Sequence, residues 1–343
     1  PKSKIGCPRA NPKSDGARRA YEEGTALVDR SHWGLIRLTG STREAFLHNQ
    51  TTADFERARA GEVVEAVVVT STARVIDWVT ALVAEDAIWL ITSPERREVL
   101  LEWFPRFVFF NDDVQFSDES DEYALFSLLG PESGELLAKL GADGVTEWEA
   151  GRHDVVTVAG VEGIRAMVGG GLLGKGYTLI VPSGGAERVR TTLHETGAEP
   201  MGTELWESLR VEQGRPAADH ELTEEHNPLE AGLWDAVSFT KGCYIGQEII
   251  ARLDTYQKLK QQLWGIRLSA PVAPGSPVTV DGTTVGVVTS VAVTPGGPFA
   301  LSYIRTKAGG AGLDVNVDGA QGRVVALPLI TRGRRDLGTR GSS

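Results

Sequence analysis

The order of apolar patterns along this chain of 343 residues is the feature that most restricts its fold. Two successive rounds of strand-like and helix-like segments fill residues 21–262, and the second round begins at the apolar run 123–129. Strand–helix units of this kind favour an α+β architecture with mostly antiparallel sheets. From Trp264 onward only short strands are expected, including a hairpin with the D-G turn Asp281-Gly282. That part is sufficient for a small β-barrel.

The same patterns predict the domain boundaries. A chain of this length exceeds one ordinary core, so we expect a first α+β lobe over residues 21–120 and a second over 121–262. The barrel is expected over residues 263–330. Residues 1–20 contain six lysines and arginines against one aspartate, which predicts a disordered basic arm. Residues 331–343 are expected to form a solvated, disordered tail.

Charge and cysteine content exclude several classes of function. The net charge of −11 argues against nucleic acid as the main partner. No run of eighteen apolar residues occurs, so no membrane span is expected. Two cysteines, Cys7 and Cys243, cannot form a disulfide framework, which indicates a reducing compartment. No H-x-x-H or C-x-x-C spacing is present, so a stable metal site is not expected.

The stretch 240–248, TKGCYIGQE, combines unusual backbone freedom with a thiol. Two glycines bracket Cys243 and Tyr244, which permits a tight turn and a close approach of the backbone to another group. The apolar spacing that follows predicts a helix from residue 246 or 247. Cys243 would then precede a helix N-terminus with Lys241 two residues away, and both features favour a thiolate. The alternative is a small, buried and inert cysteine.

Residues 241–248 resemble the K-G-C-[FY]-x-G-Q-E signature of the YgfZ-type proteins, which belong to the superfamily of the glycine cleavage T-protein. The resemblance extends over residues 21–330, including the runs 28–36 and 46–54. It implies a ring of two or three α+β lobes with a C-terminal barrel. It also implies a tetrahydrofolate ligand and a role in the assembly or repair of iron–sulfur proteins, with those proteins or their assembly factors as partners. Cys243 would be the reactive residue of such a protein.

The resemblance assigns ligand contacts to two carboxylates. Residues 210–216 are similar to the superfamily's R-x-E-x-G-x-P run, in which the glutamate, here Glu212, binds the pterin ring of folate. A carboxylate is a natural bidentate partner for that edge of the ring. Glu212 could instead pair with Arg210 or Arg215. Glu230 lies in a similar P-L-E-A-G-L run and either positions the ligand or caps a helix.

Other candidate ligand contacts lie in the first lobe and around the cysteine motif. T-proteins carry a pair of aspartates after the second strand, whereas this chain has only Asp77 there. Asp77 either faces the folate or is a solvent-side strand residue. Tyr244 could stack on the pterin, with Trp78 and Trp206 as further candidates, although core packing is the alternative for each. We add the remaining members of the motif region to the folate-binding set: Lys241, Gln247 and Arg252. Arg252 would belong, with Arg74, Lys258 and Lys260, to a basic rim for the anionic ligand.

Two other functions remain open. The first is a folate-dependent one-carbon transferase of the T-protein type, and the second is a non-catalytic folate-binding scaffold. The absence of a second aspartate beside Asp77 and the presence of Cys243 count against glycine cleavage. The run 251–256 and residues 268–271 are similar to the plastid branch of the YgfZ-type proteins. Together with a basic arm that lacks an initiator methionine, they suggest the chloroplast stroma after removal of a transit peptide. A bacterial cytoplasm or a mitochondrial matrix is the alternative, and a chain from which a tag was cut would begin in the same way.

Overall fold

The structure, a computed structural model, describes residues 12–256 and 258–334. The described chain forms two compact units. One unit contains the residues up to Arg30, Ala124–Ala150 and Asp154–Trp206, and we call it the β1 unit. The other contains Ser31–Tyr123, Gly151–His153 and the residues from Glu207 on, and we call it the barrel unit.

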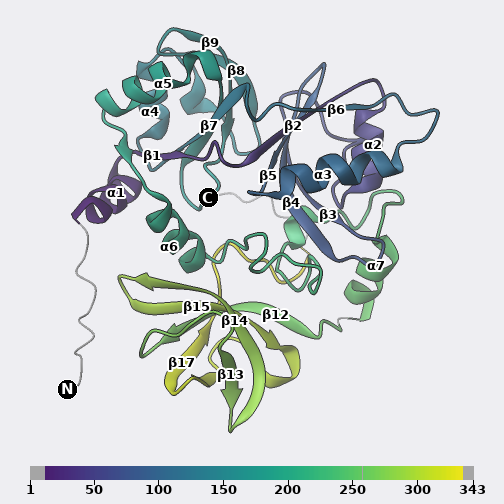
Figure 1. The fold of residues 1–343 in the computed structure, drawn as a ribbon, viewed down its shortest axis with the longest axis vertical. Coiled ribbons are helices and arrows are strands. Elements are labelled where there is room, and N and C mark those ends of the chain that lie inside the picture. Colours follow the sequence, from purple (N-terminus) through teal and green to yellow (C-terminus); the bar gives the residue numbers. More distant parts are fainter. Residues whose placement is uncertain (1–11, 257, 335–343) are drawn as a thin grey trace. The chain divides into compact units, whose positions relative to one another are not determined.

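The barrel unit begins with a five-stranded antiparallel sheet of order β3-β4-β5-β2-β6 (Figure 1). Its strands are β2 (Gly34–Thr39), β3 (Val63–Val69), β4 (Val75–Val83), β5 (Ile88–Thr92) and β6 (Gln115–Asp118). Helices α2 (Arg43–Gln50) and α3 (Arg96–Trp103), with the 3-10 turn η1 (Phe104–Phe107), pack aromatic and leucine side chains against this sheet. Strands β3, β4 and β5 coincide with the apolar runs 63–70, 75–83 and 87–92, which turn residues separate.

The second part of this unit is a closed barrel of order β12-β15-β14-β13-β16-β17. Its elements are β12 (Gln261–Leu268), β13 (Pro277–Val280), β14 (Thr283–Thr294), β15 (Gly297–Arg305), the turn η4 (Thr306–Ala308), β16 (Asp314–Val317) and β17 (Ala320–Val325). Asp281 and Gly282 have φ values of 48° and 77°. Left-handed values at both positions are what a two-residue hairpin of type I′ requires. The expected small barrel and its hairpin are confirmed.

One apolar cluster joins the five-stranded sheet to the barrel. Val67 of β3 and Val75 of β4 pack with Leu263 and Tyr303 of the barrel. Leu327, which follows the last barrel strand, belongs to the same cluster. Because buried apolar area is what stabilises packing of this kind, the sheet and the barrel support each other. The connecting segment between them carries η3 (Trp234–Ala236) and α7 (Gln247–Tyr256).

The β1 unit is built on a six-stranded sheet of order β11-β1-β7-β10-β9-β8. Its strands are β1 (Ala26–Asp29), β7 (Tyr123–Leu129), β8 (His153–Val158), β9 (Val161–Val168), β10 (Gly176–Pro182) and β11 (Glu199–Pro200). The β1–β7 and β9–β10 pairings are antiparallel, and β1–β11 is parallel. Its helical elements are α1 (Pro12–Glu23), α4 (Ser133–Lys139), η2 (Val145–Glu147) and α5 (Ser183–Glu195), and α6 (Thr203–Gln213) crosses the boundary of the two units.

The N-terminal region differs from the sequence prediction. Residues 1–11 lie outside the described part, but α1 occupies residues that were expected to be disordered. Ala17 is buried, Tyr21 donates a hydrogen bond to the carbonyl of Leu173, and Arg19 pairs with Glu23 one turn later. Short-range ion pairs and one buried face are enough to order such a helix.

The lobe boundaries also differ. Strand β1 was expected in the first lobe, yet it pairs with β7 and β11 of the other sheet. Residues 207–256, expected in the second lobe, belong to the barrel unit. The apolar run 108–110 is typical of a short strand, but Phe109 and Phe110 lie in an exposed turn. No local pattern specifies a partner so distant along the chain, which explains why the boundaries were missed.

The expected C-terminal tail is partly ordered. Residues 335–343 lie outside the described part, whereas residues 331–334 are described. The guanidinium of Arg332 lies 3.4 Å from the ring centroid of Trp264, and Arg334 forms an ion pair with Asp254. Burial lowers the pKa of Arg332 to about 10. Among the described helices, we find none that combines the length and the hydropathy needed to cross a bilayer.

Candidate functional site

The glycine-bracketed motif lies in the segment that leads into α7. Helix α7 begins at Gln247, as the sequence predicted. Gly246 has φ 82°, and a Cβ atom there would lie 2.8 Å from the carbonyl oxygen of Thr70. The motif backbone therefore approaches the β3–β4 turn as closely as only glycine permits. Cys243 is exposed, so its alternative interpretation as a buried, inert thiol is wrong.

Lys241 attaches the motif to the C-terminal end of α2. Its Nζ donates hydrogen bonds to the carbonyls of His48, Thr51 and Ala53, the last two at 2.7 Å. The His48 carbonyl belongs to the last turn of α2, where a helix leaves carbonyls without intrahelical partners, and Thr51 and Ala53 follow directly after the helix. The side chain of Lys241 is buried, and the position of Cys243 two residues later is fixed by it.

Burial changes the electrostatics of this lysine. Loss of solvent lowers the pKa of Lys241 to about 7, against the opposing influence of the Asp54 and Glu56 carboxylates. Its Nζ also lies 4.5 Å from the ring centroid of Tyr244. Tyr244 is only 8% exposed and packs with Trp234, which supports its alternative interpretation as a core aromatic residue. Burial raises the pKa of the Tyr244 phenol.

Asp77 is fully buried on β4. Its Oδ1 accepts a hydrogen bond from the backbone N–H of Trp78 at 2.9 Å, and its Oδ2 accepts one from the N–H of Ser93 at 3.0 Å. Burial raises the pKa of Asp77 to about 6, although the bonds from Ser93 and Trp78 and the charge of Arg96 act in the opposite direction. The alternative interpretation of Asp77 as a solvent-side strand residue is wrong.

Arg215 is a residue whose role the sequence did not suggest. Its guanidinium carbon lies 4.3 Å from the ring centroid of Trp78 and 5.6 Å from that of Trp33. Burial lowers the pKa of Arg215, and the charges of Glu65 and Asp77 partly offset that effect. Arginine between two indoles is a typical cation–π arrangement. The sequence Gly214-Arg215-Pro216 directly after α6 was the available signal, but Arg215 was interpreted only as a possible ion-pair partner of Glu212.

The two arginines near Glu212 bind other groups. Arg210 donates to Glu207 at 2.5 Å and to the buried Glu221 at 3.2 Å. Arg215 lies over the indoles described above. Glu212 itself is half-buried in the last turn of α6.

Glu230 is buried in a tight loop before the barrel. The side-chain oxygen of Asn227 accepts hydrogen bonds from the backbone N–H groups of Leu229 and Glu230, both at 3.0 Å. Burial raises the pKa of Glu230, while its bond from the Asn227 N–H, the charge of Arg74 and two further backbone bonds lower it. The neighbouring His226 stacks on Tyr303 with ring centroids 3.6 Å apart.

The ring of His226 is held by a neighbouring side-chain amide. Its Nδ1 lies 3.0 Å from the amide nitrogen of Gln261, and burial lowers its pKa to about 4. Within residues 12–256 and 258–334, no group of three or more histidine, cysteine or carboxylate side chains is arranged to hold a metal ion.

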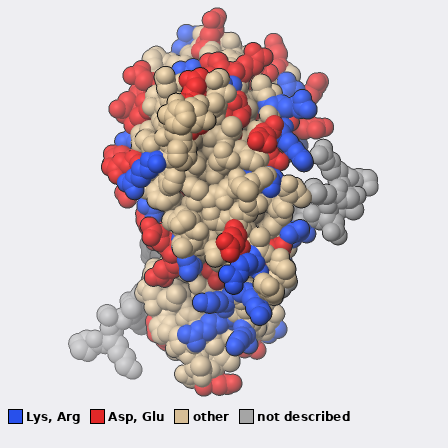
Figure 2. Space-filling view, turned by 90° about the vertical axis from the view of Figure 1, so that its right-hand side faces the viewer, with Lys and Arg blue, Asp and Glu red and all other residues tan. Residues whose placement is uncertain are grey.

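Cations gather where α7 passes into the barrel. Gln247 is half-buried at the start of α7, and Arg252 is exposed on it. Lys258 and Lys260 are exposed, and the Lys260 carbonyl accepts a hydrogen bond from Thr306. Arg305 and Lys307 flank Thr306 and are exposed as well. Figure 2 shows a group of lysine and arginine side chains over the barrel, in an otherwise acidic protein. We call Lys258, Lys260, Arg305 and Lys307 the barrel-edge cations.

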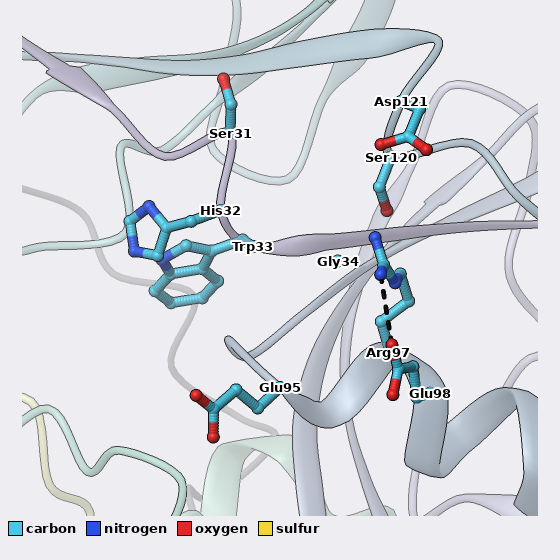
Figure 3. Close-up of a pocket in the computed structure, with 9 residues that line it drawn as sticks. All are labelled: Ser31, His32, Trp33, Gly34, Glu95, Arg97, Glu98, Ser120 and Asp121. Carbon is cyan, nitrogen blue, oxygen red and sulfur yellow. Dashed lines mark ion pairs between the residues drawn. The ribbon is translucent and has the colours of Figure 1, made fainter.

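A hollow of about 460 Å³ opens beside the tryptophan that Arg215 contacts. Figure 3 shows His32 and Trp33 on one wall and Glu95 near the opposite side. Arg97 also lines it and forms ion pairs with Glu98 and with Asp118 at 3.6 and 3.2 Å. Trp33 thus belongs both to this hollow and to the group formed with Arg215, Trp78 and Asp77. We call this group the Trp33 group.

Several known proteins are similar to this chain in sequence. The GCVT N-terminal domain family matches residues 11–241. A chloroplastic protein of Arabidopsis thaliana, provisionally named as a transferase, is 43% identical over 321 residues, covering 93% of this chain and 74% of that protein. An aminomethyltransferase of Rubrobacter xylanophilus is 31% identical over 324 residues, covering 92% of this chain and 86% of the relative.

A solved structure agrees with the architecture. The aminomethyltransferase T of the glycine cleavage system from Bartonella henselae superposes with a TM-score of 0.84 at 20% sequence identity. The match covers 93% of this chain and 90% of that one. The fold is therefore the T-protein-like α+β fold with antiparallel sheets and a C-terminal six-stranded barrel, as expected.

Proposed function

Because the chain belongs to the family of the GCVT N-terminal domain, we propose that it binds tetrahydrofolate or a derivative of it. In this proposal Cys243 is a reactive thiol that supports the assembly or repair of iron–sulfur proteins. The observation that carries the second part is an exposed cysteine whose loop is fixed by a buried lysine. A single thiolate cannot hold a cluster, which normally needs four ligands, so contact with a cluster would be shared with a client protein.

The folate would be held by groups of the barrel unit. Glu212 would accept hydrogen bonds from the pterin edge. The hollow beside Trp33 falls within the usual range of ligand sites, and an indole backed by a guanidinium offers a stacking surface for a flat ring. The barrel-edge cations, with Arg252, would attract the anionic tail of the ligand. Gln247, Glu230, Asp77 and Tyr244 complete the proposed set, and Lys241 would position Cys243.

A folate-dependent one-carbon transferase is the second candidate, because several relatives are named aminomethyltransferases. In such a reaction Asp77 would be the residue that acts on the folate. Asp77 is fully buried and accepts two backbone hydrogen bonds, which favours a supporting role instead. A folate-binding scaffold without chemistry is the third candidate. The chloroplastic relative makes the chloroplast stroma our proposed compartment, ahead of a bacterial cytoplasm or a mitochondrial matrix.

A titration with reduced folates tests the ligand. Tetrahydrofolate should bind the purified protein, and Glu212→Gln should weaken binding roughly tenfold, by the loss of a charge-assisted hydrogen bond. Glu204→Gln is the matched control, since Glu204 is an exposed carboxylate at the other end of α6. Equal affinities of the two variants would exclude the role of Glu212, and the absence of any binding would exclude folate.

Complementation of a strain that lacks the protein separates the three functions. Cys243→Ser should abolish recovery of iron–sulfur enzyme activity, while Cys7→Ser should not. Full activity of Cys243→Ser together with loss of activity in Asp77→Asn would favour the transferase. If neither variant has an effect but deletion does, the scaffold remains.

A further inference from the structure

Positive charge is concentrated on the barrel of this acidic protein (Figure 2). Residues 258–334 contain eight lysines and arginines against three aspartates, a net charge of +5, whereas the whole chain carries −11. The four barrel-edge cations make up half of these basic residues, and all four are exposed. A local field that is opposite in sign to that of the rest of the molecule attracts partners of matching charge.

The barrel-edge cations also lack counter-ions. Across residues 12–256 and 258–334, no carboxylate forms an ion pair with any of the four. Other exposed arginines of the same unit are paired, such as Arg57 with Asp54 at 3.5 Å and Arg323 with Asp314 at 3.3 Å. Like charges that are grouped without counter-ions repel one another and lower the stability of the fold. A surface that keeps such a group is suited to an anionic partner, whose charge would offset the repulsion.

Backbone hydrogen bonds hold three of these cations side by side. The backbone N–H of Thr306 donates to the carbonyl of Lys260 at 3.0 Å, and the Thr306 hydroxyl donates to the carbonyl of Leu259 at 2.8 Å. Arg305 and Lys307, on either side of Thr306, therefore lie next to Lys260. Because this backbone is already fixed, binding at the three cations would order only their side chains.

Tyr256 supplies an aromatic group beside the fourth cation. It is the last residue of α7 and is 62% exposed, and the Nζ of Lys258 lies 5.6 Å from its ring centroid. Protein interfaces are enriched in tyrosine anchors with polar and charged groups around them. The barrel edge thus offers a protein partner both an aromatic anchor and complementary charge.

The limited extent of the positive patch favours a protein over other anionic partners. A membrane surface or a nucleic acid continues beyond four cations, and the strongly acidic remainder of the chain would repel it. An acidic segment of a protein can be confined to the patch. Complementary charge on such a segment would also raise the rate of association.

We propose that the barrel-edge cations and Tyr256 form a docking surface for an acidic segment of a partner protein. The inference deepens the proposed function and rests on it for the kind of partner, an iron–sulfur protein that requires assembly or repair. Cys243 lies four residues before α7, and Tyr256 ends that helix, which is about 15 Å long. A standard interface covers ~800 Å² on each partner and is roughly 30 Å across. A client docked on the barrel edge would therefore extend as far as the exposed thiol.

The test uses a fluorescent poly-L-glutamate peptide as the probe, and fluorescence anisotropy measures its binding to the full-length protein without folate. Wild type should bind the peptide, with an affinity that falls as the salt concentration rises. The double variant Lys260→Glu, Lys307→Glu should weaken binding about tenfold or more and reduce the salt dependence. The double variant Lys139→Glu, Lys175→Glu is the matched control, because both lysines are exposed, lie outside the barrel and give the same change in net charge.

Three results would overturn the docking surface. The first is equal affinity of the two double variants for the peptide, and the second is no binding of the peptide by wild type. The third concerns other classes of partner, which are represented by phosphatidylglycerol vesicles and single-stranded oligothymidylate. If either of these binds more tightly than the peptide and is lost in Lys260→Glu, Lys307→Glu, the surface serves a membrane or a nucleic acid instead.

Competition with tetrahydrofolate separates this inference from the proposed ligand. Binding of the peptide by a protein that does not bind tetrahydrofolate would support the docking surface and refute the folate proposal. Displacement of the peptide by saturating tetrahydrofolate at constant ionic strength would assign the cations to the anionic tail of the ligand and overturn the docking surface. A peptide that stays bound at saturating tetrahydrofolate would support the docking surface.

Discussion

The carboxylic acid buried in β4 should make the stability of the protein depend on pH. The pKa of Asp77 is about 6 in the folded protein, against an ordinary value of 3.8, because the side chain is fully desolvated. Between these pH values the native state retains a proton that the unfolded chain has lost, so the free energy of unfolding falls as pH rises. At 1.36 kcal/mol per pKa unit, the contribution amounts to roughly 3 kcal/mol, complete just above pH 6.

Replacement of Asp77 by asparagine should remove this dependence. An amide supplies one acceptor for the two N–H groups of Trp78 and Ser93, so the variant loses a constant ~1 kcal/mol at every pH. The stability of wild type minus that of Asp77→Asn should fall by about 3 kcal/mol from pH 3 to pH 7. Groups common to both proteins cancel in this difference.

Equilibrium urea unfolding at constant ionic strength, followed by tryptophan fluorescence, measures the effect. Asp86→Asn is the control, since Asp86 is an exposed carboxylate near the β4–β5 turn that pairs with Arg37. Its difference from wild type should be nearly independent of pH. A difference for Asp77→Asn that stays constant, or that increases toward neutral pH, would refute the assignment of the raised pKa to burial.

Three further variants examine the groups around the site. Lys241→Met removes the donor to the carbonyls of His48, Thr51 and Ala53 and should lower the free energy of unfolding by roughly 2–4 kcal/mol. An unchanged urea midpoint would show that these hydrogen bonds are dispensable. Gly246→Ala should lower the free energy of unfolding by about 2–3 kcal/mol, because the methyl group meets the Thr70 carbonyl. The control Gly144→Ala, at φ 73° with open space around it, should lower it by only ~1 kcal/mol. Equal losses in the two variants would contradict the close approach at Gly246. In the folded protein His226 has a pKa of about 4, so wild type takes up a proton there when it unfolds at acid pH, and its free energy of unfolding falls between pH 6.5 and pH 4. In His226→Gln this fall should be smaller by on the order of 2 kcal/mol. Equal falls in the two proteins would exclude this role of His226.

The sequence predicted elements better than it predicted their partners. The strands between residues 63 and 92 coincide with long apolar runs separated by turn residues, and such runs are local signals. The hairpin at Asp281-Gly282 was found for the same reason. Ser41 and Glu44 have the S-x-x-E spacing of a capping box, yet the hydroxyl of Ser41 donates to Asp113 and α2 starts at Arg43. A competing hydrogen bond 72 residues away along the chain has no local signature.

The candidate site shows the same division. The motif predicted the start of α7 and identified Cys243 as an unusual residue, because glycine spacing and apolar periodicity can be read directly from the sequence. It could not show that Lys241 points away from the thiol and into the carbonyls at the end of α2. The relation of Arg215 to Trp33 and Trp78 was also invisible, since it depends on how α6 and the sheet pack together.

The position of β1 inside the six-stranded sheet has a consequence for biosynthesis. A ribosome releases β1 about a hundred residues before its neighbour β7, and later still β11. At typical elongation rates this delay lasts on the order of 5–20 s. The five-stranded sheet, whose strands are consecutive from Gly34 to Asp118, is able to form during that time, while β1 remains an unpaired edge that is open to wrong partners. Nascent chains arrested before residue 123 should therefore be the form of this protein that most needs a chaperone.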